Sequence, residues 1–256
     1  MTAPAAGPWP GRFVWHDLMT TDAAKSQAFY CGLFDWRIDE RPMQGFTYRM
    51  IQAGPGPIGG IVHEPSIPKS HWMPYLAVDD VDRAAARIQE LGGSVCVPPT
   101  DIPQTGRFAV VGDPQGGFFS IYRGNAESPG ADPDQPVPGR VCWNELWTGD
   151  DAGALKFYAA MFGWQDESKD IGEMGTYHVQ KLGGKEAGGI MRNPQPGTPT
   201  CWCPYFLAPD LDGSTARVKE LGGTVLMGRT EIPDVGWFSL AMDPVGAVFC
   251  LFAPKA

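Results

Sequence analysis

The stretch WHDLMTTDAAKSQAFYCGLFDW, residues 15–36, occurs a second time in this chain as WNELWTGDDAGALKFYAAMFGW, residues 143–164. The matching positions lie 128 residues apart and include a tryptophan at each end, an aspartate and a Phe-Tyr pair. Three later motifs also recur: Gly-Gly-Ile after 129 residues, and both Leu-Gly-Gly and Asp-Pro-x-Gly after 130. Because the offset drifts by only two residues, we interpret the sequence as a tandem duplication.

The repeat predicts two domains in the chain of 256 residues. A domain of roughly 120 residues is large enough for its own core, because it hides about two-thirds of its unfolded surface. We expect domain 1 over residues 11–124 and domain 2 over residues 139–256. Residues 125–138, NAESPGADPDQPVP, are expected to form the linker, since they are rich in Pro, Asp and Gly without apolar periodicity. Residues 1–10 are expected to form a flexible tail.

The charge and the composition exclude several classes of partner. The net charge is −9, and no run of Lys or Arg interrupts the acidic background, so we expect no nucleic-acid partner. No stretch approaches the roughly 18 apolar residues of a membrane helix. The N-terminus also lacks the pattern of a secretory signal, so we expect a cytoplasmic protein that does not contact a membrane. The six cysteines do not recur at matching positions, which favours reduced thiols over a disulfide framework.

Each copy contains two helix signals and several short β-type runs. In copy 1 the helices are expected to follow Asp22 and Asp80, because Asp is a favourable N-cap. Ala24 and Phe29 are expected on the buried face of the first helix. One strand precedes each helix and three follow it, so the order predicts a βαβββ module used four times in the chain. The β-type runs of copy 1 are FTYRMIQA, GGIVHE, WMPYLAV, GSVCVPP, RFAVVGD and GFFSIYR.

These modules, the pattern T-x-D followed by F-Y-x-x-x-F-x-W, the segment VDDVDRAAARIQELGG and the Asp-Pro-x-Gly turn resemble the vicinal oxygen chelate superfamily. That superfamily comprises glyoxalases, bleomycin-resistance proteins and extradiol dioxygenases. The resemblance spans residues 13–252 and is greatest to a tandem, two-domain glyoxalase-like subgroup. It implies an α+β fold of two tandem glyoxalase-like domains, each an eight-stranded, half-open mixed-sheet cup with its helices outside.

The resemblance also implies where a metal would be bound. In that superfamily the first strand of each module supplies His, Gln or Glu, and the last strand supplies Glu. Hard divalent ions prefer oxygen and imidazole ligands, so we expect no metal and no cofactor here. A register error of one residue would place His16 at the first position and restore a metal site, although copy 2 has Asn144 there. The implied positions are Trp15, Met73 and Ser120 in copy 1, and Trp143, Cys203 and Cys250 in copy 2.

Cys203 and Cys250 are predicted to face the same cup, which leaves three interpretations. Two thiolates can bind a soft metal ion. One thiol can act as a nucleophile if its pKa is lowered. Both can instead be small buried apolar side chains. The sequence favours the third interpretation, because it places no His or Lys nearby to activate a thiol.

Asp17 and Glu145 are the candidate catalytic residues. They occupy matching positions two residues after Trp15 and Trp143, so strand alternation predicts that both face into the cups. A carboxylate in an aromatic pocket has a raised pKa and can act as an acid or a base. The structural alternative is that each carboxylate accepts hydrogen bonds from the backbone or from a tyrosine.

Aromatic residues share the predicted inward parity of these acids. Such residues line small-molecule pockets, but they also fill closed barrel interiors. The candidate ligand-binding residues are Trp15, Tyr75 and Tyr122 in copy 1, and Trp143, Trp147, Cys203, Tyr205 and Cys250 in copy 2; Phe118, Val248 and Phe252 share their parity.

Together these patterns predict a metal-independent glyoxalase-like protein that binds a mid-sized aromatic small molecule. It would either sequester that ligand or transform it by acid–base chemistry, as a monomer or a weak homodimer. The alternative is a metal-dependent lyase, isomerase, dioxygenase or hydroxylase of the same superfamily. A third interpretation is a packing protein whose cups are closed by Trp and Tyr side chains.

Overall fold

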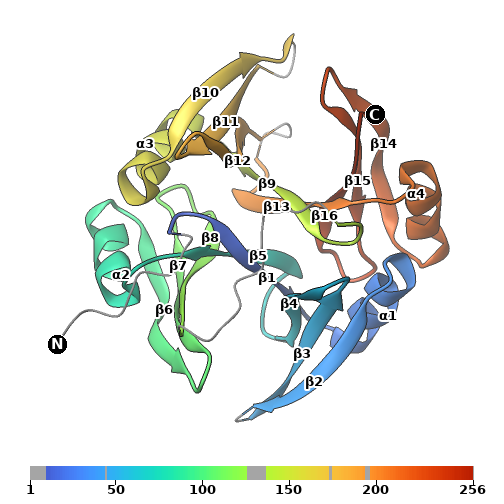
Figure 1. Ribbon diagram of the computed structural model, residues 1–256, viewed down its shortest axis with the longest axis horizontal. Helices are drawn as coiled ribbons and strands as arrows, with labels where there is room; N and C mark the ends of the chain where they lie inside the picture. The colour runs from blue at the N-terminus through green and yellow to red at the C-terminus, as the bar shows by residue number, and fades with distance from the viewer. Residues whose placement is uncertain (1–9, 44, 126–136, 173–174, 194–196, 256) are drawn as a thin grey trace. The chain divides into compact units, whose positions relative to one another are not determined.

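The computed structural model describes residues 10–43, 45–125, 137–172, 175–193 and 197–255. The order strand, helix, three strands occurs four times along the chain (Figure 1). Copy 1 contains β1 (Phe13–Thr20), α1 (Ala23–Leu33), β2 (Arg37–Met43), β3 (Phe46–Ala53), β4 (Gly56–His63), β5 (His71–Ala77), α2 (Val81–Glu90), β6 (Ser94–Ile102), β7 (Gly106–Gly112) and β8 (Phe118–Gly124). Copy 2 contains β9 (Val141–Thr148), α3 (Asp151–Phe162), β10 (Gln165–Asp170), β11 (Thr176–Leu182), β12 (Lys185–Arg192), β13 (Cys201–Leu207), α4 (Leu211–Glu220), β14 (Thr224–Ile232), β15 (Gly236–Met242) and β16 (Val248–Pro254).

The strands form two mixed sheets of eight strands each. Sheet A has the order β2-β3-β4-β1-β5-β8-β7-β6, and sheet B repeats it as β10-β11-β12-β9-β13-β16-β15-β14. The β1–β4 and β5–β8 pairs are parallel, whereas the hairpin neighbours are antiparallel. This topology confirms the predicted α+β fold of four βαβββ modules. The predicted domain boundaries stay a prediction, and most of the expected tail and linker, residues 1–9 and 126–136, lies outside the described residues.

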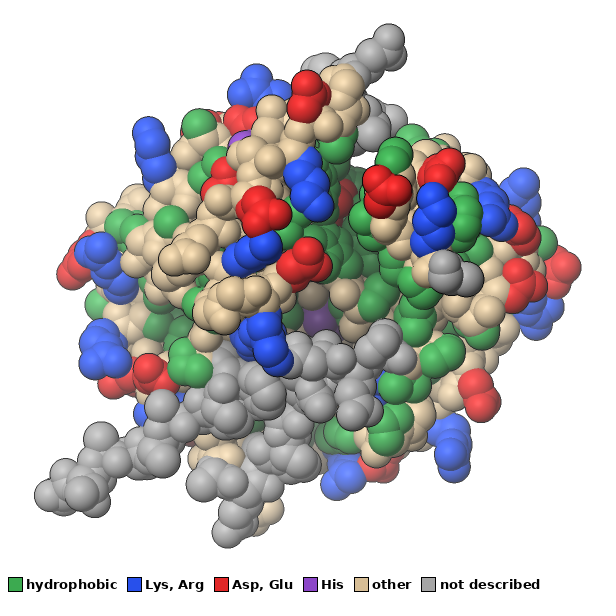
Figure 2. Space-filling view, turned by 45° about the horizontal axis from the view of Figure 1, so that its top comes forward, with side chains coloured by type: hydrophobic (Ala, Val, Ile, Leu, Met, Phe, Trp, Pro, Cys, Tyr) green, Lys and Arg blue, Asp and Glu red, His purple; other side chains and the backbone are tan. Residues whose placement is uncertain are grey.

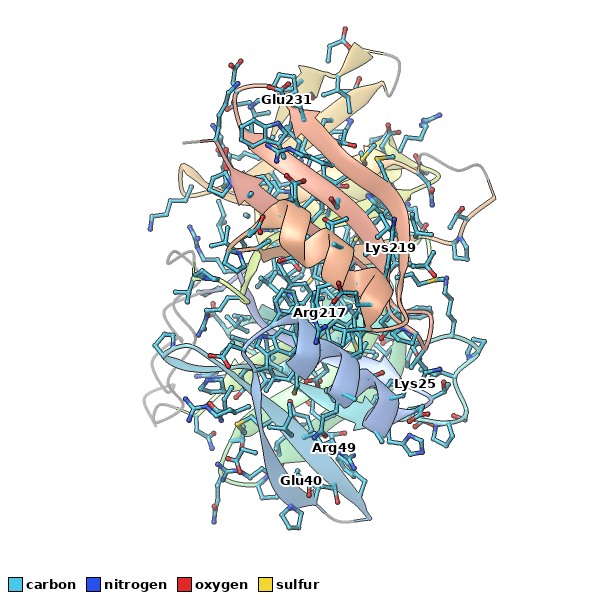
Figure 3. All side chains as sticks on the ribbon, turned by 90° about the vertical axis from the view of Figure 1, so that its right-hand side faces the viewer. Lys25, Glu40, Arg49, Arg217, Lys219 and Glu231 are labelled. Atoms are coloured by element: carbon cyan, nitrogen blue, oxygen red, sulfur yellow. The ribbon has the colours of Figure 1, made fainter. Side chains whose placement is uncertain are left out.

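Strand β2 is an edge strand that no β-type run predicted. Its sequence, RIDERPM, is polar and lacks alternation, and most of its residues are exposed. Its place is fixed by antiparallel pairing with β3, and Arg49 of β3 lies 3.5 Å from the carboxylate of Glu40 of β2 (Figure 3). Charged residues and Pro42 suit a sheet edge, because they oppose pairing with another chain.

The helices begin where the caps predicted. Asp22 accepts a hydrogen bond of 3.0 Å from the backbone N–H of Lys25, and Asp80 accepts one of 2.9 Å from Arg83. The expected buried face of α1 was wrong at Ala24, which is exposed, whereas Ala23 is buried. None of the helices in these described ranges combines the length and the apolarity needed to cross a bilayer.

The contacts divide the chain into two compact units, and each unit combines parts of both copies. Tight packing inside each unit therefore joins residues that are far apart in the sequence. Unit 1 consists of Met1–Val14, Pro74–Gly130 and Asn144–Trp202, and unit 2 consists of Trp15–Met73, Ala131–Trp143 and Cys203–Ala256.

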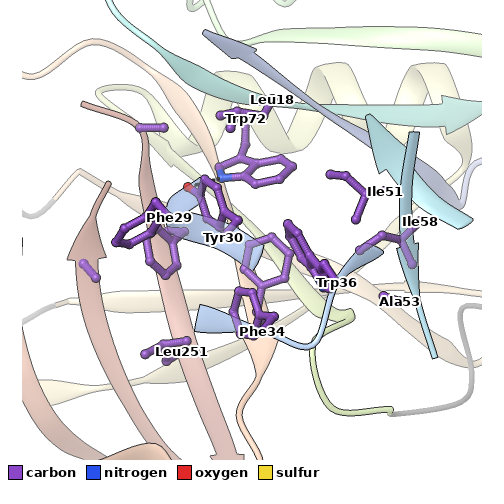
Figure 4. Packing of buried hydrophobic residues seen from close by; sticks show 14 of the residues in the cluster. Leu18, Phe29, Tyr30, Phe34, Trp36, Ile51, Ala53, Ile58, Trp72 and Leu251 are labelled. Carbon is purple, nitrogen blue, oxygen red and sulfur yellow. Dashed lines mark hydrogen bonds between the residues drawn. The ribbon is translucent and has the colours of Figure 1, made fainter. Parts of the chain in front are cut away.

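The core of unit 2 is aromatic (Figure 4). Tyr30 stacks on Trp36 with ring centroids 5.5 Å apart, and the Trp72 indole N–H donates a 3.0 Å hydrogen bond to the Tyr30 hydroxyl. Phe206 from copy 2 lies 5.2 Å from Trp72 of copy 1. Arg217 of α4 also donates to a carbonyl of α1, that of Gly32, at 3.3 Å (Figure 3).

Unit 1 has a core of the same design. Tyr158 stacks on Trp164 at 5.3 Å, and the Trp202 indole N–H donates to the Tyr158 hydroxyl at 3.2 Å. Phe119 of copy 1 packs against Tyr158 of copy 2, with ring centroids 5.8 Å apart. Both units thus bury a Tyr-Trp pair from the repeated F-Y-x-x-x-F-x-W pattern.

Candidate functional site

The first strand of copy 1 carries a polar group within unit 2. Leu18 of β1 is fully buried in the core cluster, so alternation turns its neighbour Asp17 toward the opposite face of the strand. Asp17 is only 4% exposed, and Trp15 on the same face is half-buried. His16 is buried with the parity of Leu18, so the register that would make it a ligand on the face of Asp17 does not occur.

Asp17, Trp15 and Tyr48 of β3 form a closed triangle of hydrogen bonds. The Tyr48 hydroxyl donates to Asp17 Oδ1 at 2.7 Å. The Trp15 indole N–H lies 3.0 Å from the same oxygen and 2.8 Å from the Tyr48 hydroxyl oxygen, so it donates to both. The triangle fixes a carboxylate, a phenol and an indole in one place.

Gly60 makes the room that Tyr48 needs. It lies opposite Asp17 in the parallel β1–β4 pair. A Cβ atom added to Gly60 would lie 2.2 Å from Cζ of the Tyr48 ring, a distance that no real contact tolerates. The repeated Gly-Gly-Ile motif therefore has a local function in copy 1, because its second glycine lets the phenol reach Asp17.

Tyr48 was missed in the sequence, although a signal for it exists. Thr47-Tyr48 recurs as Thr176-Tyr177 after 129 residues, which is the offset of the Gly-Gly-Ile motif. The structural alternative for Asp17 required a tyrosine as hydrogen-bond donor, and Tyr48 is that donor.

Glu145 occupies the matching position of copy 2, within unit 1. It is 4% exposed on β9 and lies opposite Gly189 of β12, as Asp17 lies opposite Gly60. The indole N–H of half-buried Trp147 donates to Glu145 Oε1 at 2.5 Å. The donor in copy 2 thus follows the acid by two residues, whereas Trp15 precedes Asp17 by two.

The remaining aromatic candidates form short rows within each unit. In unit 1 the Tyr75 ring lies 6.5 Å from Phe108 and 6.4 Å from Tyr122. The Tyr122 hydroxyl donates to the Thr105 carbonyl at 3.1 Å, which fixes its ring. In unit 2, Tyr205 is buried and lies 6.0 Å from Phe238, and Trp143 is half-buried.

The two thiols predicted to share one face lie in unit 2 and are close together. Cys203 and Cys250 are both buried, and their Sγ atoms are 3.8 Å apart. None of the six cysteines, all of which lie in the described ranges, forms a disulfide. Cys142 on β9 donates to the Tyr205 carbonyl at 3.4 Å, and burial raises the pKa of its thiol to about 12.

The other histidines lie apart from these groups. His178 of β11 is buried, and its Nδ1 lies 3.1 Å from both Asp166 Oδ2 and Ser168 Oγ on β10. His63 is exposed, and His71 Nδ1 contacts the Lys69 carbonyl at 3.0 Å. Among the residues that the structure describes, no group of three or more His, Cys, Asp or Glu could hold a metal ion.

Two surface cavities lie away from the candidate residues. One, of about 300 Å³, is in unit 2 beside Lys25 of α1 and Pro244. The other, of about 400 Å³, is in unit 1 beside Arg83 and Arg87 of α2. On the face drawn in Figure 2, acidic and basic side chains are interspersed, so this face presents no extended basic patch of the kind that binds nucleic acid.

Known proteins resemble this chain along nearly its whole length. The model of the glyoxalase/bleomycin resistance protein/dioxygenase superfamily matches residues 12–120. CFP32 of Mycobacterium tuberculosis, whose name assigns it provisionally to the glyoxylases, is 35% identical over 246 residues and covers 94% of both chains. The chain belongs to this superfamily. The anthracycline biosynthesis protein DnrV of Streptomyces peucetius is 32% identical over 262 residues, covering 94% of this superfamily member and 92% of DnrV.

Solved structures of the superfamily share the fold at low sequence identity. The Mn(II)-bound glyoxalase of Novosphingobium aromaticivorans has a TM-score of 0.66 at 16% identity, covering 95% of this chain and 82% of its own. An extradiol ring-cleaving dioxygenase from B. fuscum has a TM-score of 0.69 at 14% identity, covering 100% of this chain and 74% of its own.

The manganese-bound relative corrects one prediction. We expected no cofactor, and that expectation is wrong, because a glyoxalase with the same fold carries Mn(II). Manganese prefers carboxylate, carbonyl and water ligands. The described residues of this superfamily member include no group that fits such an ion, so the chemistry below is derived from side chains alone.

Proposed function

We propose that this protein binds a mid-sized aromatic small molecule and either sequesters it or acts on it by acid–base chemistry. The hydrogen-bonded triangle of Asp17, Tyr48 and Trp15 carries the proposal. It places a carboxylate 2.7 Å from a phenol that is half-buried rather than sealed in a core. In copy 2, Glu145 is the corresponding acid.

The triangle has the geometry of a proton relay. A general base must lie about 2.6–3.2 Å from the proton that it takes, and Asp17 meets this condition for the Tyr48 hydroxyl. The indole N–H of Trp15 donates to the same hydroxyl oxygen and orients the phenol. A ligand hydroxyl that contacts Tyr48 would exchange a proton with it, and Asp17 would receive or return the phenolic proton.

The aromatic part of the proposal is supported by the side chains around these acids and by relatives. Indole and phenol rings supply large, rigid contact area for planar ligands. Half-buried Trp15, Trp143 and Trp147 offer such area beside the two acids. DnrV is named as an anthracycline biosynthesis protein, and anthracyclines are polycyclic aromatic compounds.

Binding of an anthracycline, followed by quenching of tryptophan fluorescence, tests the proposal. We expect Asp17→Asn and Tyr48→Phe each to weaken binding about tenfold, the effect of one lost hydrogen bond. Asp39→Asn is the matched control, because Asp39 is an exposed acid on β2 that pairs with Arg41. Equal binding by all three variants, or no binding of any polycyclic aromatic compound tried, would refute the proposal.

A metal-dependent reaction is the second candidate, and the Mn(II)-bound glyoxalase with this fold favours it. It corresponds to the lyase, isomerase, dioxygenase or hydroxylase alternative. Elemental analysis of the purified protein separates the two candidates. Stoichiometric manganese that is required for turnover would support the second candidate, whereas binding and turnover unchanged by chelation would support the first.

A further inference from the structure

Cys203 and Cys250 form a thiol pair that the proposed function does not use. Their Sγ atoms lie 3.8 Å apart, and the side chains are 1% and 0% exposed. They come from β13 and β16, which pair in parallel with Tyr205 opposite Cys250. Alternation places both thiols on the face opposite to the core residues Phe206 and Leu251, so the pair is not part of the aromatic core.

The separation of the two sulfur atoms matches that of thiolates on one metal ion. Disulfide sulfurs are about 2.05 Å apart, so closing a disulfide here would require a large approach of the two strands. Two thiolates at about 2.3 Å from one tetrahedral zinc ion lie about 3.8 Å apart, which is the observed spacing. We propose that Cys203 and Cys250 bind a thiophilic divalent ion of the zinc group, whose other coordination positions are open.

The charge balance of this site suits its burial. Apolar surroundings disfavour a thiolate, so the pair is protonated when no ion is bound. A divalent ion replaces the two S–H protons, which pass to water, while two metal–sulfur bonds form and no atom is oxidised. The product carries no net charge, because two thiolates balance one divalent cation. Binding therefore releases two protons for each ion and leaves no buried charge uncompensated.

Cys142 is near the pair but is not a third ligand. Its thiol donates to the Tyr205 carbonyl, and burial raises its pKa to about 12. No group of three His, Cys, Asp or Glu within the described ranges could hold an ion, so the site has two protein ligands. Cys142 is therefore a matched control for Cys203 and Cys250.

The ligand chemistry distinguishes this site from that of the manganese-bound relative. Thiolates select zinc and monovalent copper, whereas manganese prefers oxygen ligands. We therefore expect Cd²⁺, an optical probe for zinc-group sites, to bind to the full-length protein in the presence of excess Mn²⁺.

Anaerobic titration of the full-length protein with Cd²⁺ at pH 7 tests the site. We expect sulfur-to-cadmium charge-transfer absorption that saturates with one ion, release of two protons and a rise in the unfolding temperature. Cys203→Ser and Cys250→Ser should each weaken binding at least tenfold, and Cys142→Ser should leave it unchanged. Binding that survives both single substitutions, or that is abolished by excess Mn²⁺, would overturn the proposal.

A second measurement keeps the test valid if a serine variant fails to fold. Cadmium NMR of the wild-type protein reports the ligand atoms directly through the chemical shift of the bound ion. A shift typical of two sulfur ligands supports the site. A shift typical of oxygen ligands alone, or the absence of any signal from a bound ion, rejects it.

Discussion

Tyr158 of α3 donates a 2.9 Å hydrogen bond to Oδ2 of Asp113, the first residue of the turn between β7 and β8. This bond joins the Phe-Tyr motif of copy 2 to the Asp-Pro-x-Gly motif of copy 1. The other oxygen of Asp113 accepts from the backbone N–H groups of Gln115 and Gly117 at 2.9 and 2.8 Å. Two of the most regular motifs of the repeat thus serve the core of unit 1 rather than a site.

Tyr158→Phe should lower the free energy of unfolding by about 1–3 kcal/mol, because it removes the Tyr158 donor from a buried carboxylate oxygen. Urea unfolding measures the loss. Tyr122→Phe is the matched control, since its hydroxyl bonds to the Thr105 carbonyl at an exposed position and should cost less than about 1 kcal/mol. An equal cost for the two variants would contradict the structural role of Tyr158.

Asp113 gives the stability a defined pH dependence. Burial raises the pKa of its carboxyl above the usual value, and the hydrogen bonds from Gly117 and Tyr158 offset this only in part. The folded state therefore holds the proton more tightly than the unfolded state. The resulting stability is fully present below the usual carboxyl pKa of about 4 and is lost as the pH rises through the folded value.

The difference in unfolding free energy between the wild type and Asp113→Asn isolates this effect, because all other titrating groups cancel. The advantage of the wild type should shrink between pH 4 and pH 7. An advantage that grows over this range would show that hydrogen bonding, rather than burial, dominates the pKa of Asp113.

Gly60→Ala should displace Tyr48 and open the triangle with Asp17. The added Cβ would lie 2.2 Å from the phenol ring, so a loss of about 1–3 kcal/mol in the free energy of unfolding is expected. Ligand binding should weaken as much as in Tyr48→Phe. Gly56→Ala, in the same strand, is the control because nothing lies within 4 Å of the added atom. A neutral Gly60→Ala variant would mean that Tyr48 has space to move without loss.

Cys142 should resist alkylation, because the pKa of about 12 leaves almost no thiolate at pH 8. Exposed Cys96 should react at least a hundredfold faster with iodoacetamide. Peptide mass spectrometry after timed quenching gives both rates. Comparable rates for the two thiols would contradict the burial of Cys142.

The sequence predicted the modules because their signals are local. Asp22 and Asp80 cap helices, and the repeat offset aligns the strands of both copies. Strand β2 was not recognised, since an exposed edge strand needs no apolar alternation. Its existence depends on pairing with β3, which is a tertiary contact.

The candidate site was predictable only in part. Alternation placed Asp17 and Trp15 on one face, but the partner across the strands depends on the register between β1, β3 and β4. Tyr48 is 31 residues from Asp17, so no local pattern links the two side chains. The repeat of Thr-Tyr marked it, and the purpose of Gly60 became clear only once the ring was in place.

The mixed origin of each core has a consequence for how such a chain can arise. Phe29 and Tyr30 pack against Phe249, with ring centroids 6.0 and 5.5 Å apart, so α1 of copy 1 rests on aromatic residues of copy 2. A chain with one copy would leave that surface bare, and a second molecule would have to cover it. Gene duplication therefore converts an exchange of helices between two subunits into a covalent arrangement whose assembly no longer depends on protein concentration.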